Sequence, residues 1–282
     1  RKPGSQNSGS QNSGPQNPGP QNPGSQNPGL RIPKVEFKDM EFVYAGAKEP
    51  ALKDISFCAM AGQTIGVIGG TGSGKSTLVN LIPRFYDAAS GQVLVDGTDV
   101  REYSLDELRD KTGVVPQKSV LFKGTLRDNM RWGKQDASDE EIYRALDTAQ
   151  AREFVDSKGE GLDLYIDQGG HNLSGGQRQR LTIARALVRR PEILIMDDSA
   201  SALDFATDAR LRKAIRENTG DMTVFIVSQR ATTIKSADTI LVLDEGRLAG
   251  MGTHKELLKD CQVYREICLS QLSKEEVERD EQ

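Results

Sequence analysis

Short apolar runs that alternate with helical patterns dominate the chain after its first thirty or so residues. Residues 35–44 alternate loosely between apolar and polar side chains, and we expect them and residues 51–58 to form strands. Residues 64–68 are a continuous apolar run that ends in glycines, which is typical of a buried strand. The pattern of residues 75–84 predicts a helix directly after it.

The second half of the chain first becomes mostly helical and then alternates again. Ser104 with Glu107, and Ser138 with Glu141, have the spacing of capping boxes and predict helix starts. Residues 117–188 are mostly helical in pattern. Strand-like runs return at residues 193–196, 223–227 and 239–243. Strands that alternate with helices predict parallel βαβ units, so we expect an α/β core interrupted by a helical insert at about residues 117–188.

The two ends of the chain differ from this pattern. Residues 4–28 repeat a five-residue unit of Gly, Ser, Pro, Gln and Asn without an apolar side chain, so we interpret residues 1–31 as a flexible linker. A self-associating Gln/Asn segment is the alternative, although frequent Pro and Gly oppose it. Residues 271–282 form a strongly charged tail, which we expect to be a frayed, solvated helix end. The folded domain is then residues 32–270.

Composition narrows the class of protein. A net charge of −4 without a long basic block gives no support to nucleic-acid binding, and 36% hydrophobic residues suit one large soluble domain or two small ones. Cys58, Cys261 and Cys268 are odd in number and fit no metal spacing, so we expect reduced thiols, buried or half-buried. No apolar run reaches the roughly 18 residues of a membrane span. The chain begins at Arg1, and we interpret it as a fragment whose upstream part could include a membrane domain.

A phosphate-binding loop is the strongest chemical signal. The pattern G-x-x-x-x-G-K-[ST] is matched by Gly69, Gly70, Thr71, Gly72, Ser73, Gly74, Lys75 and Ser76, with Thr77 following. The glycines let backbone N–H groups turn toward phosphates, Lys75 would reach the β- and γ-phosphates, and Ser76 would bind Mg²⁺. A plain glycine-rich turn is the alternative. The position after a strand and before a helix favours the phosphate loop.

A second anchor is the apolar run of residues 193–196, which ends in Asp197. A buried strand with this pattern delivers the carboxylate to its carboxyl end, where ligands bind in such folds. Asp197 would hold Mg²⁺ through water. The pattern is weak alone, since many buried strands end in Asp.

Between these anchors lies Leu173-Ser174-Gly175-Gly176-Gln177, followed by Arg178-Gln179-Arg180. LSGGQ ahead of such a strand is the signature of ABC ATPases, which the chain resembles over about residues 34–270. The resemblance implies a P-loop NTPase core with a mostly parallel sheet, an N-terminal antiparallel β subdomain and an inserted helical subdomain carrying the signature. It also implies ATP and Mg²⁺ as ligands, and a head-to-tail dimer in which the signature of each chain grips the ATP on the other.

The resemblance assigns roles to further positions. Tyr44 would stack on adenine, with an ordinary strand tyrosine as the alternative. Gln117 would touch Mg²⁺ and sense the membrane domain, and Asp204 ends the D-loop of residues 201–204, which crosses to the partner. Residues 124–180 look most like exporters, whose ATPase is usually fused after a six-helix membrane domain. We therefore expect contact with the coupling helices of such a domain at the cytoplasmic face of the membrane.

Three positions depart from the family pattern. Asp198 replaces the usual Glu base, and a carboxylate retracted by about 1 Å can cost ~10²-fold in rate unless the backbone moves to compensate. Gln229 replaces the switch histidine, and an amide carries neither a positive charge nor a proton to shuttle. Gln168 replaces an exporter Glu in a loop facing the membrane domain. The two histidines, His171 and His254, lie elsewhere, and we expect both at the surface.

These departures predict a subunit that binds ATP, hydrolyses it slowly, and completes a partner's site with its own signature. The partner of such a heterodimer would carry the missing Glu and His. A regulatory ATP-binding module and an ordinary homodimeric motor are the alternatives. An ABC protein of DNA repair or translation is disfavoured, because only about a hundred positions separate Lys75 from Ser174 and contain no long heptad run. The cargo is not predicted.

Overall fold

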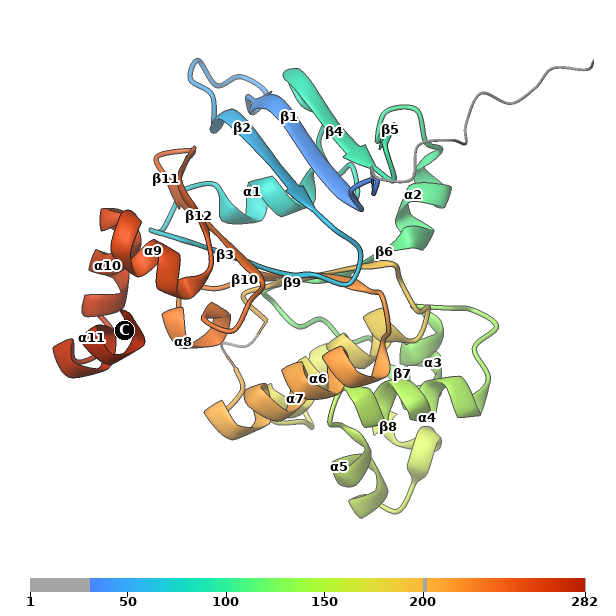
Figure 1. Cartoon of the computed structure of the whole chain (residues 1–282). Coiled ribbons are helices and arrows are strands. Elements are labelled where there is room, and N and C mark those ends of the chain that lie inside the picture. Colours follow the sequence, from blue (N-terminus) through green and yellow to red (C-terminus); the bar gives the residue numbers. More distant parts are fainter. Residues whose placement is uncertain (1–30, 200–201, 282) are drawn as a thin grey trace, which may run out of the picture. The chain divides into compact units, whose positions relative to one another are not determined.

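The computed structural model describes residues 31–199 and 202–281 (Figure 1). The predicted N-terminal linker therefore lies outside the described residues, apart from Arg31. Among the described residues, no helix is long and apolar enough to cross a membrane.

A six-stranded sheet forms the centre of the fold, in the order β12-β11-β3-β10-β9-β6. Its strands are β3 (Thr64–Gly69), β6 (Thr112–Val115), β9 (Ile193–Asp197), β10 (Thr223–Val227), β11 (Thr239–Asp244) and β12 (Arg247–Gly252). All neighbours are parallel except β11 and β12, and Phe225 of β10 lies opposite both Ile65 and Ile195. The parallel strands β3, β9, β10 and β11 are mostly apolar and buried, because both faces of a parallel sheet are covered.

A four-stranded antiparallel sheet in the order β2-β1-β4-β5 covers one side of this core (Figure 1). Its strands are β1 (Val35–Phe42), β2 (Leu52–Ala59), β4 (Ser90–Val95) and β5 (Thr98–Asp99). The rings of Phe37 and Phe57 stack 4.6 Å apart, and α1 (Lys75–Asn80) contributes to the apolar core that the two sheets share. The predicted antiparallel subdomain is confirmed.

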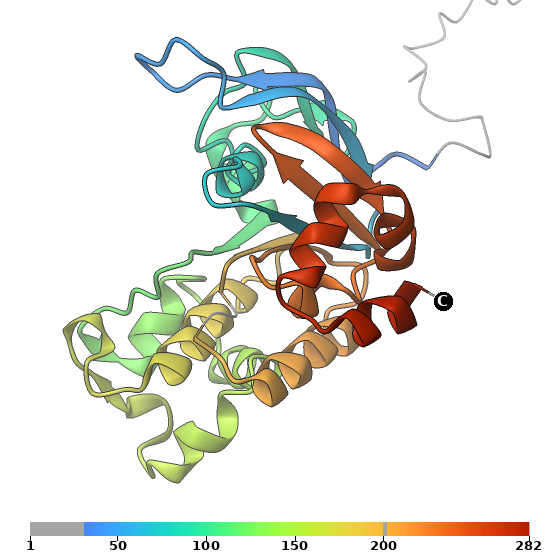
Figure 2. The ribbon, with the colours of Figure 1, turned by 90° about the vertical axis from the view of Figure 1, so that its left-hand side faces the viewer.

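The predicted helical insert is also confirmed (Figure 2). After α2 (Leu105–Lys111) and β6, the chain forms α3 (Leu126–Arg131), α4 (Asp139–Thr148), α5 (Arg152–Ser157) and α6 (Gly175–Leu187). Single turns at Gly161–Asp163 and Gln168–Gly170 and a small pair of strands, β7 (Gly124–Thr125) and β8 (Tyr165–Ile166), complete it. Both predicted capping boxes, at Ser104 and Ser138, are formed. Helix α7 (Phe205–Asn218) follows β9.

The C-terminal segment corrects two expectations. After α8 (Ala231–Ile234), the chain ends in α9 (His254–Asp260), α10 (Gln262–Leu269) and α11 (Lys274–Glu281). The charged tail is a largely exposed helix, as expected, but it is packed rather than frayed, because Val277 of α11 is only 1% exposed, within the apolar core. His254 is buried rather than at the surface: its Nδ1 lies 2.8 Å from the Tyr264 hydroxyl of α10 and its Nε2 3.3 Å from the Asp280 carboxylate of α11.

The cysteines and the other histidine were predicted with mixed success. Cys261 and Cys268 are buried thiols, as expected. Cys58 is exposed, since its position on β2 faces away from the shared core, and the expectation of burial is wrong there. His171 is exposed, as expected.

Candidate functional site

The predicted phosphate loop connects β3 to α1 and contains two glycines that tolerate no side chain. A Cβ on Gly69 would lie 2.1 Å from the carbonyl oxygen of Leu243, and one on Gly74 would lie 2.6 Å from the side chain of Leu52. Gly74 also has φ of +97°, a left-handed conformation that favours glycine. Thr71 and Gly72 are exposed at the tip of the loop. The loop therefore presents backbone N–H groups on a compact turn at the start of α1.

Lys75 occupies the centre of this loop. Its Nζ donates hydrogen bonds to the carbonyl oxygens of Gly69, at 3.0 Å, and Gly70, at 2.7 Å. Burial lowers the pKa of Lys75 from its ordinary value, while the carboxylates of Asp198 and Asp197 oppose that shift. The Lys75 side chain is thus held over the loop, and the negative charges of Asp198 and Asp197 stabilise its protonated form.

Ser76 and Asp197 meet at the mouth of the loop. The Ser76 hydroxyl donates a hydrogen bond of 2.9 Å to Oδ1 of Asp197, which lies at the carboxyl end of β9 as predicted. Burial raises the pKa of Asp197; the bond from Ser76 opposes this shift, and the charge of Asp198 adds to it. A cation beside these groups would relieve that unfavourable burial of charge. A hydroxyl and a carboxylate oxygen are ligands that Mg²⁺ accepts, directly or through water, so the residues fit such an ion.

Asp198 and Gln117 form a second contact beside the first. The Gln117 side-chain amide lies 3.3 Å from Oδ2 of Asp198 and donates a hydrogen bond to it. Asp198 has φ of +44°, and its backbone N–H donates to the carbonyl of Val227 at the end of β10. The local backbone of Asp198 is therefore fixed by the neighbouring strand in an uncommon conformation.

One cavity of about 450 Å³ collects most of the predicted residues. It is lined by Tyr44, Ala51, Thr71, Gly72, Gly74, Lys75, Ser76, Thr77, Gln117, Asp197, Asp198, Val227, Ser228 and Gln229. Gln229 follows β10, so strand order brings it beside β9 and its two aspartates. Ala51, Val227 and Ser228 were not predicted as site residues: nothing in the sequence marks Ala51, whereas Val227 and Ser228 directly precede Gln229.

Tyr44 lies just past the end of β1, at the edge of the cavity. Its hydroxyl shares a hydrogen bond of 2.6 Å with Oγ1 of Thr77 on α1. Its ring meets those of Phe42 and Tyr86 edge-on, with centroids 4.7 Å and 5.6 Å away, and stays 40% exposed. The ring is therefore anchored at one end and accessible, as a stacking platform requires.

The LSGGQ residues do not line this cavity. Ser174 caps α6: its Oγ accepts a hydrogen bond from the Gln177 N–H at 3.2 Å, and the Gln177 side chain accepts one from the Ser174 N–H at 3.0 Å. Gly175 and Gly176 form the first turn of α6, whose remaining N–H groups have no partner within the helix. The signature is therefore an exposed helix start, away from the chain's own phosphate loop.

Two further predicted positions lie near the signature. Asp204 caps α7 by accepting a hydrogen bond of 2.9 Å from the Thr207 N–H, a bond that lowers the pKa of Asp204. Residues 200 and 201 lie outside the described residues, and these include Ser201, the first residue of the predicted D-loop. Gln168 is exposed in the turn before the signature.

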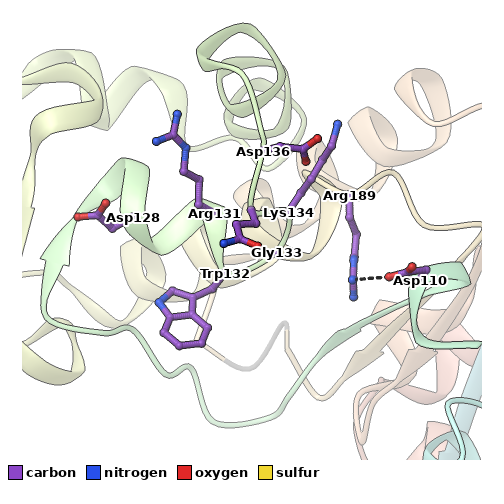
Figure 3. A pocket seen from close by; sticks show the side chains of 9 residues that line it. Asp110, Asp128, Arg131, Trp132, Gly133, Lys134, Asp136 and Arg189 are labelled. Atoms are coloured by element: carbon purple, nitrogen blue, oxygen red, sulfur yellow. Dashed lines mark hydrogen bonds and ion pairs between the residues drawn. The ribbon is translucent and has the colours of Figure 1, made fainter. Parts of the chain in front are cut away.

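A second cavity, of about 820 Å³, opens on the helical insert between α2, α3 and the chain after α6 (Figure 3). Asp110, Asp128, Arg131, Trp132, Gly133, Lys134, Gln135, Asp136 and Arg189 line it. Arg189 forms an ion pair of 2.8 Å with Asp110, and Trp132 is 70% exposed. The ring of Trp132 lies 5.0 Å from that of Phe122, which is itself 39% exposed. Charged side chains thus make up most of the lining of the cavity, and Trp132, with Phe122 against it, adds an exposed aromatic pair beside them.

Comparisons with known proteins agree with this geometry. The model of a family described as ABC transporter matches residues 52–201. An ABC transporter ATP-binding protein of Mycobacterium tuberculosis is 49% identical over 82% of this chain and 40% of its own length. An ATP-dependent lipid A-core flippase of Haemophilus influenzae is 43% identical over 84% of this chain and 41% of its own length. The chain spans about two fifths of the curated relatives it matches.

A solved structure supports the same conclusion. The structure of a bacterial Atm1-family ABC exporter with ATP bound superimposes with a TM-score of 0.82 and 37% identity, covering 87% of this chain and 43% of that chain. Fold, motif order and sequence similarity therefore agree: the chain belongs to the ABC transporter family, and it comprises the nucleotide-binding domain.

Proposed function

We propose that this domain binds ATP with Mg²⁺ and hydrolyses it slowly, as the motor of an ABC exporter. The observation that carries the proposal is the single cavity that joins Lys75, Ser76, Asp197, Asp198 and Gln229 to the exposed ring of Tyr44. Tyr44 would stack on adenine, and the loop with Lys75 would hold the phosphates. Ser76, Asp197 and Gln117 would hold Mg²⁺, which neutralises phosphate charge when bound.

The slow rate follows from two residues in the cavity. Asp198 would act as the base toward the attacking water, and its carboxylate is held by the Gln117 amide at 3.3 Å. The hydrogen bond from the Asp198 N–H to the carbonyl of Val227 fixes the backbone at this position. The backbone therefore does not shift to compensate for the shorter side chain of aspartate. Gln229 would donate a hydrogen bond to the γ-phosphate without the charge of a histidine.

The test is single-turnover ATP hydrolysis with Mg²⁺ by this chain and by an Asp198→Glu, Gln229→His double variant, with ATP affinity measured in parallel. We expect both proteins to bind ATP and the double variant to hydrolyse it about 10²-fold faster. A fast wild-type domain that gains nothing would instead favour an ordinary, homodimeric motor. Negligible hydrolysis by both proteins would favour a regulatory ATP-binding module.

The partner that we propose is a second ATPase subunit carrying Glu and His at the positions of Asp198 and Gln229. Support comes from the start of α6, where Gly175 and Gly176 offer N–H groups to a phosphate and where none of the signature residues lines the chain's own cavity. The signature would complete the partner's site, with Gln177 fixing the cap and the D-loop before Asp204 crossing between subunits.

The surface that we propose for a transmembrane domain is the second cavity with its aromatic rim (Figure 3). Exposed aromatic side chains surrounded by charges are typical of a protein–protein contact. This surface would suit coupling helices of the transmembrane domain. Such a helix would place an apolar residue against Trp132 and charged residues against Arg131 and Asp136. This contact would place the domain at the cytoplasmic face of the membrane. One relative is named as a flippase and one solved structure as an exporter, and we propose by analogy that this domain powers export of a cargo.

A further inference from the structure

The side chain of Gln271 connects the C-terminal helices to the segment that carries Gln229. Its Nε2 donates a hydrogen bond of 2.7 Å to the carbonyl oxygen of Gln229, and its Oε1 accepts one of 2.9 Å from the N–H of Ala231. One amide thus holds the backbone on both sides of Arg230. We propose that Gln271 is a positioning residue for the nucleotide site, and that the C-terminal helices set the position of Gln229 through it.

The segment from Ser228 to Ala231 depends on few other contacts. Ser228 is attached to the core, because its N–H donates to the carbonyl of Val67 at 3.1 Å and its Oγ accepts from the N–H of Arg230 at 3.0 Å. Arg230 precedes α8 as its N-cap residue but makes no side-chain cap bond. The amide of Gln271 supplies the missing acceptor at Ala231, the first residue of that helix. Without it, the N–H of Ala231 would lose its acceptor, and the turn would be held by Ser228, by the bond from the Thr233 N–H to the carbonyl of Arg230 and by the buried methyl group of Ala231.

Gln271 is itself well anchored. It lies in the turn between α10 and α11, where its N–H and that of Leu272 both donate to the carbonyl of Cys268, at 3.0 Å and 2.8 Å. Helix α11 is held in turn by the buried Val277 and by Arg265, whose guanidinium lies 2.7 Å from Oε2 of Glu281. The amide that holds the Gln229 segment therefore belongs to a packed element.

The far end of α8 contacts α11, the helix that follows Gln271. Lys235 follows α8, and its Nζ lies 3.4 Å from Oδ2 of Asp280 on α11. The same carboxylate oxygen lies 3.3 Å from Nε2 of His254 on α9. Contacts at Ala231 and at Lys235 thus bracket the four residues of α8 between the C-terminal helices and the cavity. A displacement of the C-terminal helices would therefore change the contacts at both ends of α8, and the position of Gln229 with them.

This inference rests on the proposed function, in which Gln229 contacts the γ-phosphate. ADP lacks that phosphate, so loss of the Gln271 bridge should weaken ATP binding more than ADP binding. General destabilisation of the domain would weaken both nucleotides alike. The ratio of the two affinities therefore separates positioning from stability.

The experiment uses three variants of the full chain. Gln271→Met keeps the length of the side chain and removes both hydrogen bonds. Gln271→Glu keeps an acceptor for Ala231 but loses the donor to Gln229. Gln262→Met on α10 is the matched control, since that exposed glutamine bonds Glu266 of its own helix, at 2.8 Å. Affinities for Mg-ATP and Mg-ADP are measured by calorimetry, and hydrogen exchange of the Ala231 amide by NMR.

We expect Gln271→Met to speed exchange at Ala231 about tenfold and to weaken ATP binding about fivefold, with ADP binding unchanged, in line with the loss of two hydrogen bonds. Gln271→Glu should restore slow exchange at Ala231 but not the affinity for ATP. The control should match the wild type in every measurement.

The inference is overturned if Gln271→Met leaves the ratio of ATP to ADP affinity unchanged, whether both affinities stay as in the wild type or fall together. A wild-type chain that binds no ATP would refute the proposed function instead, a result that is distinct because the inference concerns a change between variants.

Discussion

Ser76 and Asp197 are 121 positions apart in the sequence, yet the hydroxyl of one donates a 2.9 Å hydrogen bond to the carboxylate of the other. The contact arises because the loop after β3 and the end of β9 open at the same edge of the parallel sheet, with β10 between the two strands. The two oxygens therefore converge on one point beside Lys75.

Ser76→Ala should weaken ATP binding in the presence of Mg²⁺ about tenfold, and much less in EDTA, because the hydroxyl serves the metal ion. Calorimetry under both conditions measures the difference. Ser56→Ala is the matched control, since Ser56 donates a 3.0 Å bond to Asp39 far from the cavity. An equal loss with and without Mg²⁺ would show that Ser76 acts on the fold of the loop instead.

Ser174→Ala should reduce ATP turnover of the assembled pair of subunits more than Asp198→Ala does. Ser174 would serve the fast site of the partner, whereas Asp198 belongs to the slow site. We expect a loss of about tenfold or more for the first substitution and less than about twofold for the second, since a single charge-assisted hydrogen bond supplies about 1.5–3 kcal/mol. Steady-state phosphate release measures both. The reverse order would contradict the assignment of roles.

Glu192→Gln should lower stability at neutral pH but not in acid. Lys34 and Lys111 lie 2.7 Å and 2.9 Å from the Glu192 carboxylate, and their hydrogen bonds lower its pKa. A carboxyl with a lowered folded-state pKa stabilises the fold above its unfolded pKa of about 4.3, and loses that contribution as pH falls through the folded value.

The carboxylate is half exposed, so we expect only about 0.5–1 kcal/mol at pH 7. Urea unfolding of the wild type and Glu192→Gln at pH 7 and pH 3 measures the effect. The difference between the two proteins should shrink at the lower pH, and Glu278→Gln on the exposed side of α11 is the control. A difference that persists unchanged at pH 3 would rule out an electrostatic origin.

Val277→Ala should lower the free energy of unfolding by about 1–3 kcal/mol, because the side chain is 1% exposed and leaves a cavity in the core. Glu278→Ala, one residue on and exposed, should change it by less than about 0.5 kcal/mol. Equal effects of the two substitutions in urea unfolding would show that α11 does not stay packed in solution.

Much of the fold could be predicted because the apolar runs are long and uniform. The prediction for β10 matches the structure, and that for β9 misses only Asp197, since a strand buried on both faces needs apolar residues throughout. Helix α1 was predicted to reach residue 84 but ends at Asn80. Leu81 and Ile82 continue the apolar pattern while packing from a turn, and Arg84 has φ of +56°, which no helix accommodates.

The site could be predicted as far as local motifs extend. The phosphate loop and the end of β9 can be recognised in the sequence, because each needs particular residues within a few positions. The role of Gln271 could not be predicted, since a glutamine before a charged helix looks like any other exposed residue. Its partners lie about forty positions earlier, and only packing of α11 brings them together. His254 escaped prediction for the same reason: its burial depends on Tyr264 and Asp280.

Trp132 has a practical consequence for spectroscopy. It is the single tryptophan of the chain and is 70% exposed, so the indole emission of the free domain should be that of a hydrated ring. A protein that covers the second cavity would bury this one chromophore and shift its emission to the blue. The ring does not line the cavity that contains Lys75, so the signal should report assembly at that surface separately from nucleotide binding. The native chain thus carries its own reporter of docking, with no label required.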